Sequence, residues 1–304
     1  MSDNQAPLLF VLSGASGLLG SALASLLTAK GHRVVRLVRR SPKSESEIEW
    51  DPEQGSIDKT RLEGADVFIH LSGENVGEGR WTEARKKLLI SSRTDTTGLL
   101  ARTIAAMEKK PRRFISASAI GYYGDQRSGA LTESARRGEG FLAEVCEAWE
   151  RATEPAEKAG VETVHMRIGV VLARDGGALA KLLPVFKLGA GGPVGSGRQV
   201  MSWVSLADAV RAFHFVSVAK EMSGPVNVVS PNPVENGTLA KTLGRVLNRP
   251  AFLRVPELAI DVMFGQMGRE TVLASQRVVP ERLIAAGFAF EHPELEDALR
   301  AALS

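Results

Sequence analysis

The sequence has 304 residues, of which 44% are hydrophobic, and its formal charge at pH 7 is +3 with a pI near 9.1. That length and composition allow a large buried core and suit one large α/β domain, alone or with a smaller lobe. No run approaches the roughly 18 apolar residues of a membrane helix, and the basic residues form only short, separated pairs, so we expect neither a membrane protein nor a nucleic-acid-binding one.

The cysteines and histidines of the sequence indicate whether the protein binds a metal and in which cellular compartment it works. The one cysteine is Cys146, so the chain can form neither an internal disulfide nor a cysteine-rich metal site, and the five histidines include no close pair. We therefore expect no bound metal. The lone thiol, and the lack of a basic and then apolar N-terminal stretch, favour a reducing compartment, and we predict the cytoplasm.

The first motif in the chain is a glycine-rich turn. Three glycines follow the apolar run 8–12 and open a segment with apolar residues at helical spacing, which Gly31 ends. Glycine leaves the backbone open to a ligand, and the positive end of a helix dipole attracts an anion. This strand, turn and helix therefore predict a site for the phosphates of a dinucleotide. The residues assigned to it are Gly14, Ser16, Gly17, Leu18, Leu19 and Gly20.

Two arginines follow the next expected strand, 33–38. Arg39 and Arg40 lie about 20 residues after Gly20, where NAD-binding proteins usually carry an acid that binds the ribose 2′-hydroxyl. An acid would repel a 2′-phosphate, whereas a guanidinium group pairs with one through charge-assisted hydrogen bonds. We therefore predict NADP rather than NAD as the cofactor. The alternative is that the two arginines only solvate the end of the strand.

Two further expected strands end at the same edge of the sheet as the glycine turn. One is the buried run 67–71, and the other, 113–116, leads into the segment 117–125. Between them, Thr82 is predicted to cap a helix that reaches Arg93, and a second helical stretch follows to Met107. These two strands and the next expected strand, 161–172, contribute further candidate residues for cofactor binding. They are Leu71, Ser72, Gly73, Ala117 and Arg167.

The alternation of strands and helices continues to Arg174 and then breaks. A long helix is expected at 140–158 and a strand at 161–172. The predicted fold class is α/β, a Rossmann-type doubly wound parallel sheet with a small, mostly helical C-terminal substrate lobe. We place the NADP-binding domain at 1–174, with segments from about 200 to 230 returning to it, and the substrate lobe mainly at 175–304. The segments of the lobe expected to be mostly helical are 237–247, 256–267, 270–278, 280–286 and 293–303.

Several short motifs resemble those of a known family. They are Gly73-Glu74-Asn75, Gly79-Arg80-Trp81-Thr82, Ser92-Arg93, the segment 118–124, the segment 175–181 and Gly195-Ser196-Gly197-Arg198-Gln199. With them the chain resembles the extended and atypical short-chain dehydrogenase/reductases, and among these the "epimerase family protein" branch of the NAD-dependent epimerase/dehydratase superfamily. The resemblance runs from residue 8 to about 303. It implies a Rossmann fold, an NADP-type cofactor and a substrate cleft between two lobes, but no particular reaction.

The catalytic pair of short-chain dehydrogenases is missing from this sequence. Those enzymes use a tyrosine hydroxyl whose pKa is lowered by a lysine four residues later, and no Tyr-x-x-x-Lys occurs here. On the helix where the family places the pair, Leu142 and Cys146 take the two positions. The two tyrosines of the chain, Tyr122 and Tyr123, lie in an earlier segment, and the family's serine position falls one residue after Ser118.

Two functional classes fit these residues. In the first, the protein is an NADP-dependent oxidoreductase or epimerase, with Tyr123 as a substitute acid, Ser118 orienting the substrate, and Tyr122 and Glu144 in reserve. In the second, it binds NADP(H) without turnover, as a sensor or scaffold. The candidate residues for a polar small-molecule substrate are Glu74, Asn75, Arg80, Tyr122, Arg198 and Trp203. For each of them the alternative role is packing, capping or organisation of its own loop.

Overall fold

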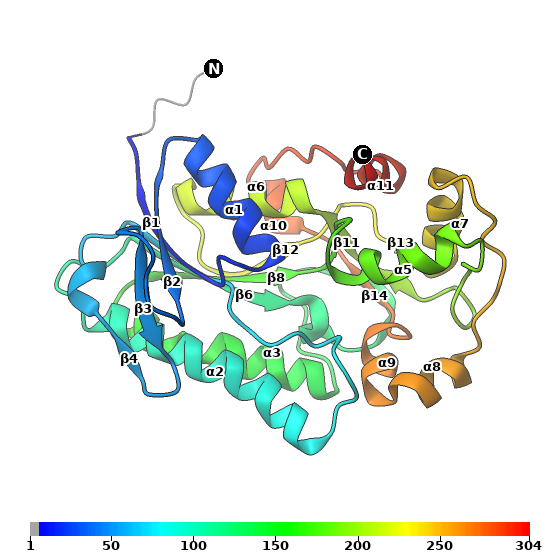
Figure 1. The fold of residues 1–304 in the computed structure, drawn as a ribbon, viewed down its shortest axis with the longest axis horizontal. Helices are drawn as coiled ribbons and strands as arrows, with labels where there is room; N and C mark the ends of the chain where they lie inside the picture. The colour runs from blue at the N-terminus through cyan, green and yellow to red at the C-terminus, as the bar shows by residue number, and fades with distance from the viewer. Residues whose placement is uncertain (1–5) are drawn as a thin grey trace.

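The computed structural model describes residues 6–304, and an eight-stranded sheet runs through the middle of the molecule (Figure 1). The strand order is β12-β8-β6-β5-β1-β2-β3-β4, and every pairing is parallel except that of β3 with β4. The strands are β1 (Leu9–Ser13), β2 (Arg33–Val38), β3 (Glu47–Asp51), β4 (Ser56–Ile57), β5 (Val67–His70), β6 (Arg113–Ala119), β8 (Glu162–Ile168) and β12 (Gly224–Val228). Strand order reverses between β1 and β5, the point where open α/β sheets bind ligands.

Helices cover both faces of this sheet. On one face α1 (Leu18–Ala29) packs beside α6 (Leu206–Val218), and on the other lie α2 (Glu83–Ala105), α3 (Phe141–Arg151) and α4 (Glu154–Lys158) (Figure 1). The side chains of β1 alternate accordingly. Phe10 and Leu12 pack in the core cluster of α1 and α6, whereas Val11 packs in the cluster that includes α2. Each face of the sheet therefore has its own apolar core.

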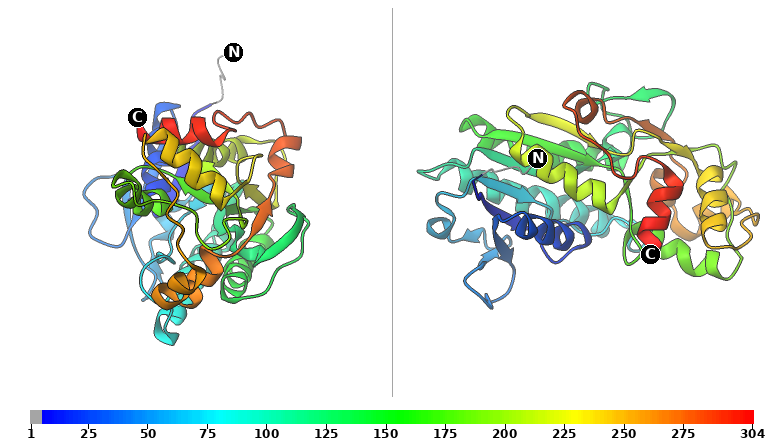
Figure 2. Two further views of the ribbon diagram at one scale, coloured as in Figure 1. Left: turned by 90° about the vertical axis from the view of Figure 1, so that its right-hand side faces the viewer. Right: turned by 90° about the horizontal axis from the view of Figure 1, so that it is seen from above.

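The C-terminal lobe gathers at the carboxyl end of the parallel strands. Its helices are α5 (Gly177–Lys187), α7 (Asn236–Val246), α8 (Glu257–Phe264), α9 (Gln266–Thr271) and α11 (Leu295–Leu303). Figure 2 shows α11 beside α7, and α5, α7 and α11 share a third apolar core. Short strands pair outside the main sheet, namely β7 (Gln126–Leu131) with β14 (Gln276–Val278), β9 (Val170–Leu172) with β11 (Trp203–Ser205), and β10 (Val200–Met201) with β13 (Val234–Glu235). The remaining elements are α10 (Glu281–Ala285) and the 3₁₀ helices η1 (Lys59–Leu62) and η2 (Ile120–Tyr123).

The predicted fold class is confirmed, while several predicted elements differ in detail. The two helical stretches expected from Thr82 to Met107 are one continuous helix, α2. The helix expected at 140–158 is interrupted between α3 and α4, because Pro155 has no N–H to continue the hydrogen-bond ladder. The strand expected at 161–172 divides at Gly169, where the chain leaves β8 and β9 pairs with β11 instead. The segment 270–278 is helical only to Thr271 and ends in β14, which pairs with β7 about 150 residues earlier. The domain boundary near residue 174 stays a prediction.

Candidate active site at the carboxyl edge of the sheet

The glycine turn follows β1 directly, and two of its glycines have no room for a side chain. Gly14 has φ = +69°, and a Cβ there would lie 2.8 Å from the carbonyl carbon of Leu71. A Cβ on Gly20 would collide with the carbonyl oxygen of Gly14. Gly17 differs, because its nearest neighbour would be that same oxygen at 3.4 Å. Gly14 and Gly20 thus bring β1, α1 and the end of β5 together, and Gly17 stays on the open side.

The N-terminus of α1 has no side-chain cap among residues 6–304. Gly17 is its N-cap residue, no described side chain accepts a hydrogen bond from the first turn, and that turn contains no acid. Helix N-terminal N–H groups without partners and the positive end of the dipole form a site for an anion. Ser16 is exposed beside it, while Leu18 contacts Gly176 and Leu19 packs on the core. The turn therefore fits a phosphate group.

The two arginines after β2 differ in their partners. Arg40 donates two hydrogen bonds to the Glu47 carboxylate, at 2.8 and 2.7 Å, and these bonds, with the Lys43 N–H, lower the pKa of Glu47 to about 2. Arg39 is exposed, and its side chain has no hydrogen bond or ion pair with any residue from 6 to 304. Arg39 is thus the arginine that is free to bind a ligand, whereas Arg40 braces the loop before β3.

A buried histidine links the ends of β1 and β5 to α2. His70 lies 2.6 Å by Nδ1 from the Ser13 hydroxyl and 3.1 Å by Nε2 from the Thr96 hydroxyl. Because Thr96 donates its own proton to backbone carbonyls, Nε2 of His70 must carry the hydrogen and Nδ1 must accept one from Ser13. Burial lowers the pKa of His70 to about 3. The sequence pattern contained no signal for this network.

The predicted catalytic residues lie in a buried polar network on the α3 side of the sheet. Ser118 donates a 2.7 Å hydrogen bond to Glu150, which also pairs with the Arg167 guanidinium through two bonds of 2.8 Å. Arg167 donates to the Tyr123 hydroxyl, which in turn donates to the Asn227 side-chain oxygen at 2.7 Å. Tyr123 is fully buried, and burial raises its pKa.

This network changes the expected roles of several residues. The hydroxyls of Ser118 and Tyr123 are both engaged within the protein, and Arg167, predicted to contact the cofactor, is 3% exposed and pairs with Glu150. Tyr122 is half-buried, its ring lies 3.4 Å beneath the guanidinium carbon of Arg167, and its hydroxyl has no hydrogen bond within 6–304. Of the two tyrosines, Tyr122 therefore has the hydroxyl that a substrate can use.

The predicted substrate residues do not converge on one point. Glu74 forms an ion pair with Arg85 at 3.1 Å, and Asn75 bonds to Gly77 and Glu78 of its own loop. Arg80 donates to the carbonyl oxygens of Val262 and Met263 at the end of α8, so it joins the two lobes.

Two more of these residues lie in the C-terminal half of the chain. Arg198 is exposed, and its guanidinium group has no partner among residues 6–304. Trp203 corrects an expectation, because it is fully buried and its indole N–H bonds to the Asn232 carbonyl, which leaves no surface for a ligand.

The positions of the missing Tyr–Lys pair face the loop that carries Tyr122. Leu142 and Cys146 both lie beside Gly121, where an added Cβ would be 3.1 Å from Leu142 and 3.6 Å from the Cys146 sulfur. Burial raises the pKa of the Cys146 thiol to about 11, so it stays protonated. Glu270 of the C-terminal lobe accepts the N–H groups of Phe141 and Leu142 and thereby caps α3, a contact that no sequence motif indicated.

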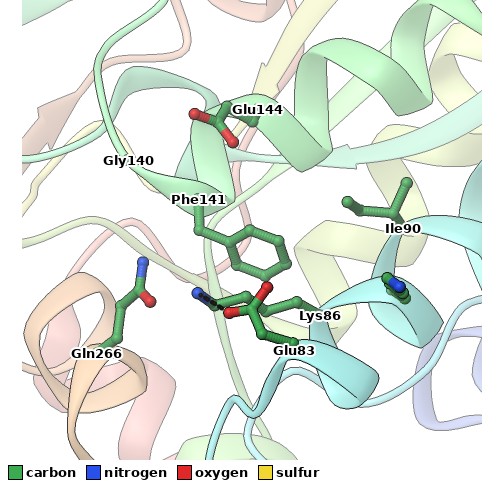
Figure 3. Close-up of a pocket in the computed structure, with 8 residues that line it drawn as sticks. Glu83, Lys86, Ile90, Gly140, Phe141, Glu144 and Gln266 are labelled. Carbon is green, nitrogen blue, oxygen red and sulfur yellow. Dashed lines mark hydrogen bonds and ion pairs between the residues drawn. The ribbon is translucent and has the colours of Figure 1, made fainter.

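A hollow of about 410 Å³ lies on the outer side of α2 and α3, next to α9 (Figure 3). The Phe141 ring forms part of its wall, and Lys86 pairs with Glu83 beside it. Of the residues predicted for the site, Glu144 lines this hollow. Across residues 6–304 no cluster of three potential metal ligands occurs, and no helix there is long and apolar enough to cross a membrane.

Comparison with protein families divides the chain into two matched parts. Residues 10–229 match the model of the NAD dependent epimerase/dehydratase family. Residues 255–302 match a domain of unknown function, DUF1731. The second match contains α8, α9, β14, α10 and most of α11, so it includes Glu270 and the strand that pairs with β7.

Similar proteins extend over nearly the whole chain. Epimerase family protein Mb2239 of Mycobacterium bovis is 42% identical over 95% of both chains, and YfhF of Bacillus subtilis is 36% identical over 95% of both. Among solved structures, human epimerase family protein SDR39U1 (isoform 2), crystallised with NADPH, superimposes with a TM-score of 0.90 at 32% identity, covering 98% of this chain and all of that one.

Proposed function

Because the chain belongs to the NAD-dependent epimerase/dehydratase family, we propose that it binds NADPH and uses it in an oxidoreductase or epimerase reaction on a polar small molecule. The observation that carries the proposal concerns two groups that lack a protein partner among the described residues. They are the N-terminus of α1, which follows the turn of Gly14, and the guanidinium group of Arg39. The first suits the diphosphate and the second the 2′-phosphate. The human relative crystallised with NADPH supports the same choice of coenzyme.

The chain's own residues then have separate tasks. The turn around Gly17 and the ends of β2 and β5 hold the coenzyme, whose nicotinamide ring supplies or accepts a hydride when bound. Tyr122 fits the exchange of a proton with the substrate better than Tyr123, because its hydroxyl makes no hydrogen bond with the described residues while that of Tyr123 is bonded twice. Ser118 and Tyr123 then hold the strand and loop in place. The free buried thiol of Cys146 favours the cytoplasm as the working compartment.

Calorimetric titration with NADPH and with NADH tests the coenzyme proposal. We expect NADPH to bind more tightly, and Arg39→Ala to remove that preference through a loss of about 1.5–3 kcal/mol, roughly 10- to 100-fold in Kd. Arg40→Ala should affect the two coenzymes alike, because Arg40 is engaged with Glu47. Equal losses of NADPH and NADH affinity in Arg39→Ala would remove the 2′-phosphate assignment.

A second function, coenzyme binding without turnover, is favoured by one observation. The hydroxyls of Ser118 and Tyr123 both bond inside the protein. A screen for NADPH oxidation with sugars, nucleotide sugars, quinones and aldehydes separates the two functions. Turnover that Tyr122→Phe abolishes and Tyr123→Phe retains supports the enzyme, whereas tight NADPH binding without turnover on any of these substrates supports a sensor.

A further inference from the structure

Exposed apolar side chains are concentrated in one part of the C-terminal lobe. Across residues 6–304 nine large hydrophobic side chains are exposed, and seven of them lie in the two short segments 185–188 and 252–263. The seven are Val185, Leu188, Phe252, Leu253, Leu258, Val262 and Met263. A single exposed apolar residue is normal on a protein surface, whereas a group of them marks a face that contacts another surface.

Backbone contacts hold the two segments side by side. The Arg249 side chain donates to the Lys187 carbonyl at 2.9 Å, and the N–H of Leu253 donates to the Gly191 carbonyl at 3.2 Å. The chain after α5 therefore runs beside the segment that leads into α8. In Figure 1 that segment and α8 lie at the right-hand end of the molecule, and Figure 2 (left) shows this end from the front. We call the surface formed by the end of α5, this segment and α8 the α5–α8 face.

Helix α8 is apolar on two opposite sides. Ile260 and Phe264 pack toward α9, where a Cβ on Gly268 would lie 2.7 Å from the first and 3.0 Å from the second. Leu258 and Val262 are one turn apart on the other side of the helix, and they are 72% and 64% exposed. A helix at a water surface normally has a polar outer side. The outer side of α8 thus has the composition of a contact surface.

Positive charge occurs in the same two parts of the chain. The segments 177–200 and 248–263 contain five cations and two acids, so their net charge of +3 equals the formal charge of the whole chain. Asp261, one of the two acids, already pairs with Arg269. The cations are Lys181, Lys187, Arg198, Arg249 and Arg254, and the other acid is Glu257. The α5–α8 face is therefore apolar and basic, whereas the rest of the chain is neutral overall.

These properties distinguish between kinds of partner. Two copies of the chain joined through this face would bring like charges together, which opposes association. A helix of another protein needs a groove, whereas Leu188, Phe252 and Leu258 protrude, at 84%, 73% and 72% exposure. A bilayer with anionic lipids suits both features. Its headgroups attract lysine and arginine, and protruding apolar side chains enter the boundary between headgroups and acyl chains.

We propose that the α5–α8 face docks the folded protein on an anionic lipid surface. Phe252, Leu258 and Val262 enter the headgroup boundary, and Lys187 and Arg254, which form no ion pair with any residue from 6 to 304, bind lipid phosphates. The protein lies on the bilayer and does not cross it, so the docking is reversible. It is independent of the proposed coenzyme binding.

Sedimentation with lipid vesicles, without coenzyme, tests the docking. We expect the protein to partition at least roughly tenfold more strongly onto phosphatidylcholine vesicles with about 30% phosphatidylglycerol than onto phosphatidylcholine alone. About 1 M salt should remove the difference, because it shortens the Debye length to about 3 Å. Equal partitioning onto the two kinds of vesicle, or no binding to the anionic ones, would overturn the proposal and leave the proposed NADPH binding unaffected.

Two double variants locate the contact on the molecule. Phe252→Ser with Leu258→Ser removes apolar side chains, and Lys187→Gln with Arg254→Gln removes charge. Each pair should weaken binding to the anionic vesicles by roughly tenfold or more. All four side chains are exposed, so the variants should fold, and circular dichroism checks this. Wild-type binding by both folded variants would place the lipid contact elsewhere.

Matched controls come from exposed residues of other elements. Ile284→Ser removes an apolar side chain that is 53% exposed on α10, and Arg102→Gln removes an exposed charge from α2. Both should bind vesicles as the wild type does, and losses equal to those of the double variants would overturn the role of the α5–α8 face. Analytical ultracentrifugation without lipid tests the competing partner. A dimer that Phe252→Ser with Leu258→Ser abolishes would assign this face to a second copy of the chain instead.

Discussion

At the scale of single residues, the carboxyl edge of the sheet is built from buried polar groups that satisfy one another. His70 is an example, since the Ser13 and Thr96 hydroxyls define its tautomer and leave no place for a second ring proton. In the same way, the Ser118 hydroxyl donates its hydrogen bond to Glu150 and the Tyr123 hydroxyl donates its own to Asn227. Buried groups with complete partners hold the backbone in place. Groups that lack partners within the described chain, such as the guanidinium of Arg39, are the candidates for ligand binding.

The neutral state of His70 predicts a pH dependence of stability. The folded protein has a His70 pKa of about 3, whereas the unfolded chain protonates this ring near pH 6.5. The unfolded state therefore binds more protons between these values, and stability falls as the pH falls below 6.5, by about 1.4 kcal/mol per pH unit. His70→Asn cannot take up this proton, so its free energy of unfolding should fall less between pH 6.5 and 5. Urea unfolding at several pH values measures the difference, and identical slopes would contradict the assignment.

At the scale of elements, the N-termini of α1 and α3 differ in how they are capped. The N-cap of α1 is Gly17 and the N-cap of α3 is Gly140, and neither glycine has a side chain to cap its helix. Glu270 of the C-terminal lobe caps α3 through two backbone N–H groups, while no side chain in the described part of the chain caps α1. The helix that the protein leaves open is the one that we assign to phosphate.

Gly17→Asp tests the open helix. Gly17 has extended backbone and room for a Cβ, so an aspartate there can accept hydrogen bonds from the first turn of α1. We expect the melting temperature without ligand to stay the same or rise, and the NADPH affinity to fall by about 100-fold, because a carboxylate replaces and repels the phosphate. A variant that keeps both its stability and its affinity would place the phosphates elsewhere.

Glu270→Ala tests the capped helix. Loss of the cap should lower the free energy of unfolding by about 1 kcal/mol, the typical cost of N-cap removal. Glu144→Ala is the matched control, because Glu144 lies in the first turn of α3, is exposed and makes no capping bond. It should cost no more than about 0.5 kcal/mol, by loss of its interaction with the helix dipole. Chemical denaturation compares the two, and equal costs would show that Glu270 acts by charge alone.

At the scale of the whole molecule, the C-terminal lobe is bonded directly to the loops that form the edge of the site. Lys181 of α5 donates to the Gly77 carbonyl, and Gln276 of β14 donates to the carbonyls of Ile120 and Gly124, at either end of the tyrosine segment. In the other direction, Arg80 of the Rossmann domain donates to the Met263 carbonyl at the end of α8. The segment 255–302 therefore helps to position the Rossmann loops.

These links predict that the chain unfolds as one unit and that the coenzyme stabilises all of it. Calorimetric melting should show a single transition. NADPH at 100 times its Kd should add about 2.7 kcal/mol, and NADH at the same concentration should add less. Arg39→Ala should abolish the difference between the coenzymes without changing the melting temperature of the free protein, since its side chain has no partner within 6–304. Two transitions, of which NADPH shifts only the first, would show that the lobes are independent.

The sequence by itself determined the Rossmann fold, the glycine turn after β1 and the family. Each of these depends on short-range patterns, because a glycine run between an apolar strand and an amphipathic helix has few structural solutions. The two arginines after β2 were also found in this way. The absence of a Tyr-x-x-x-Lys pair likewise follows from the sequence without any structure.

Only the tertiary structure decided which of the candidate residues are free to act. Arg39 and Arg40 are adjacent in sequence, but Glu47 engages just one of them, and Tyr122 and Tyr123 differ in the same way through Asn227. Whether a polar group has a hydrogen-bond partner depends on residues far away in the chain. The hydrophobic periodicity of the sequence contains no information about such pairings.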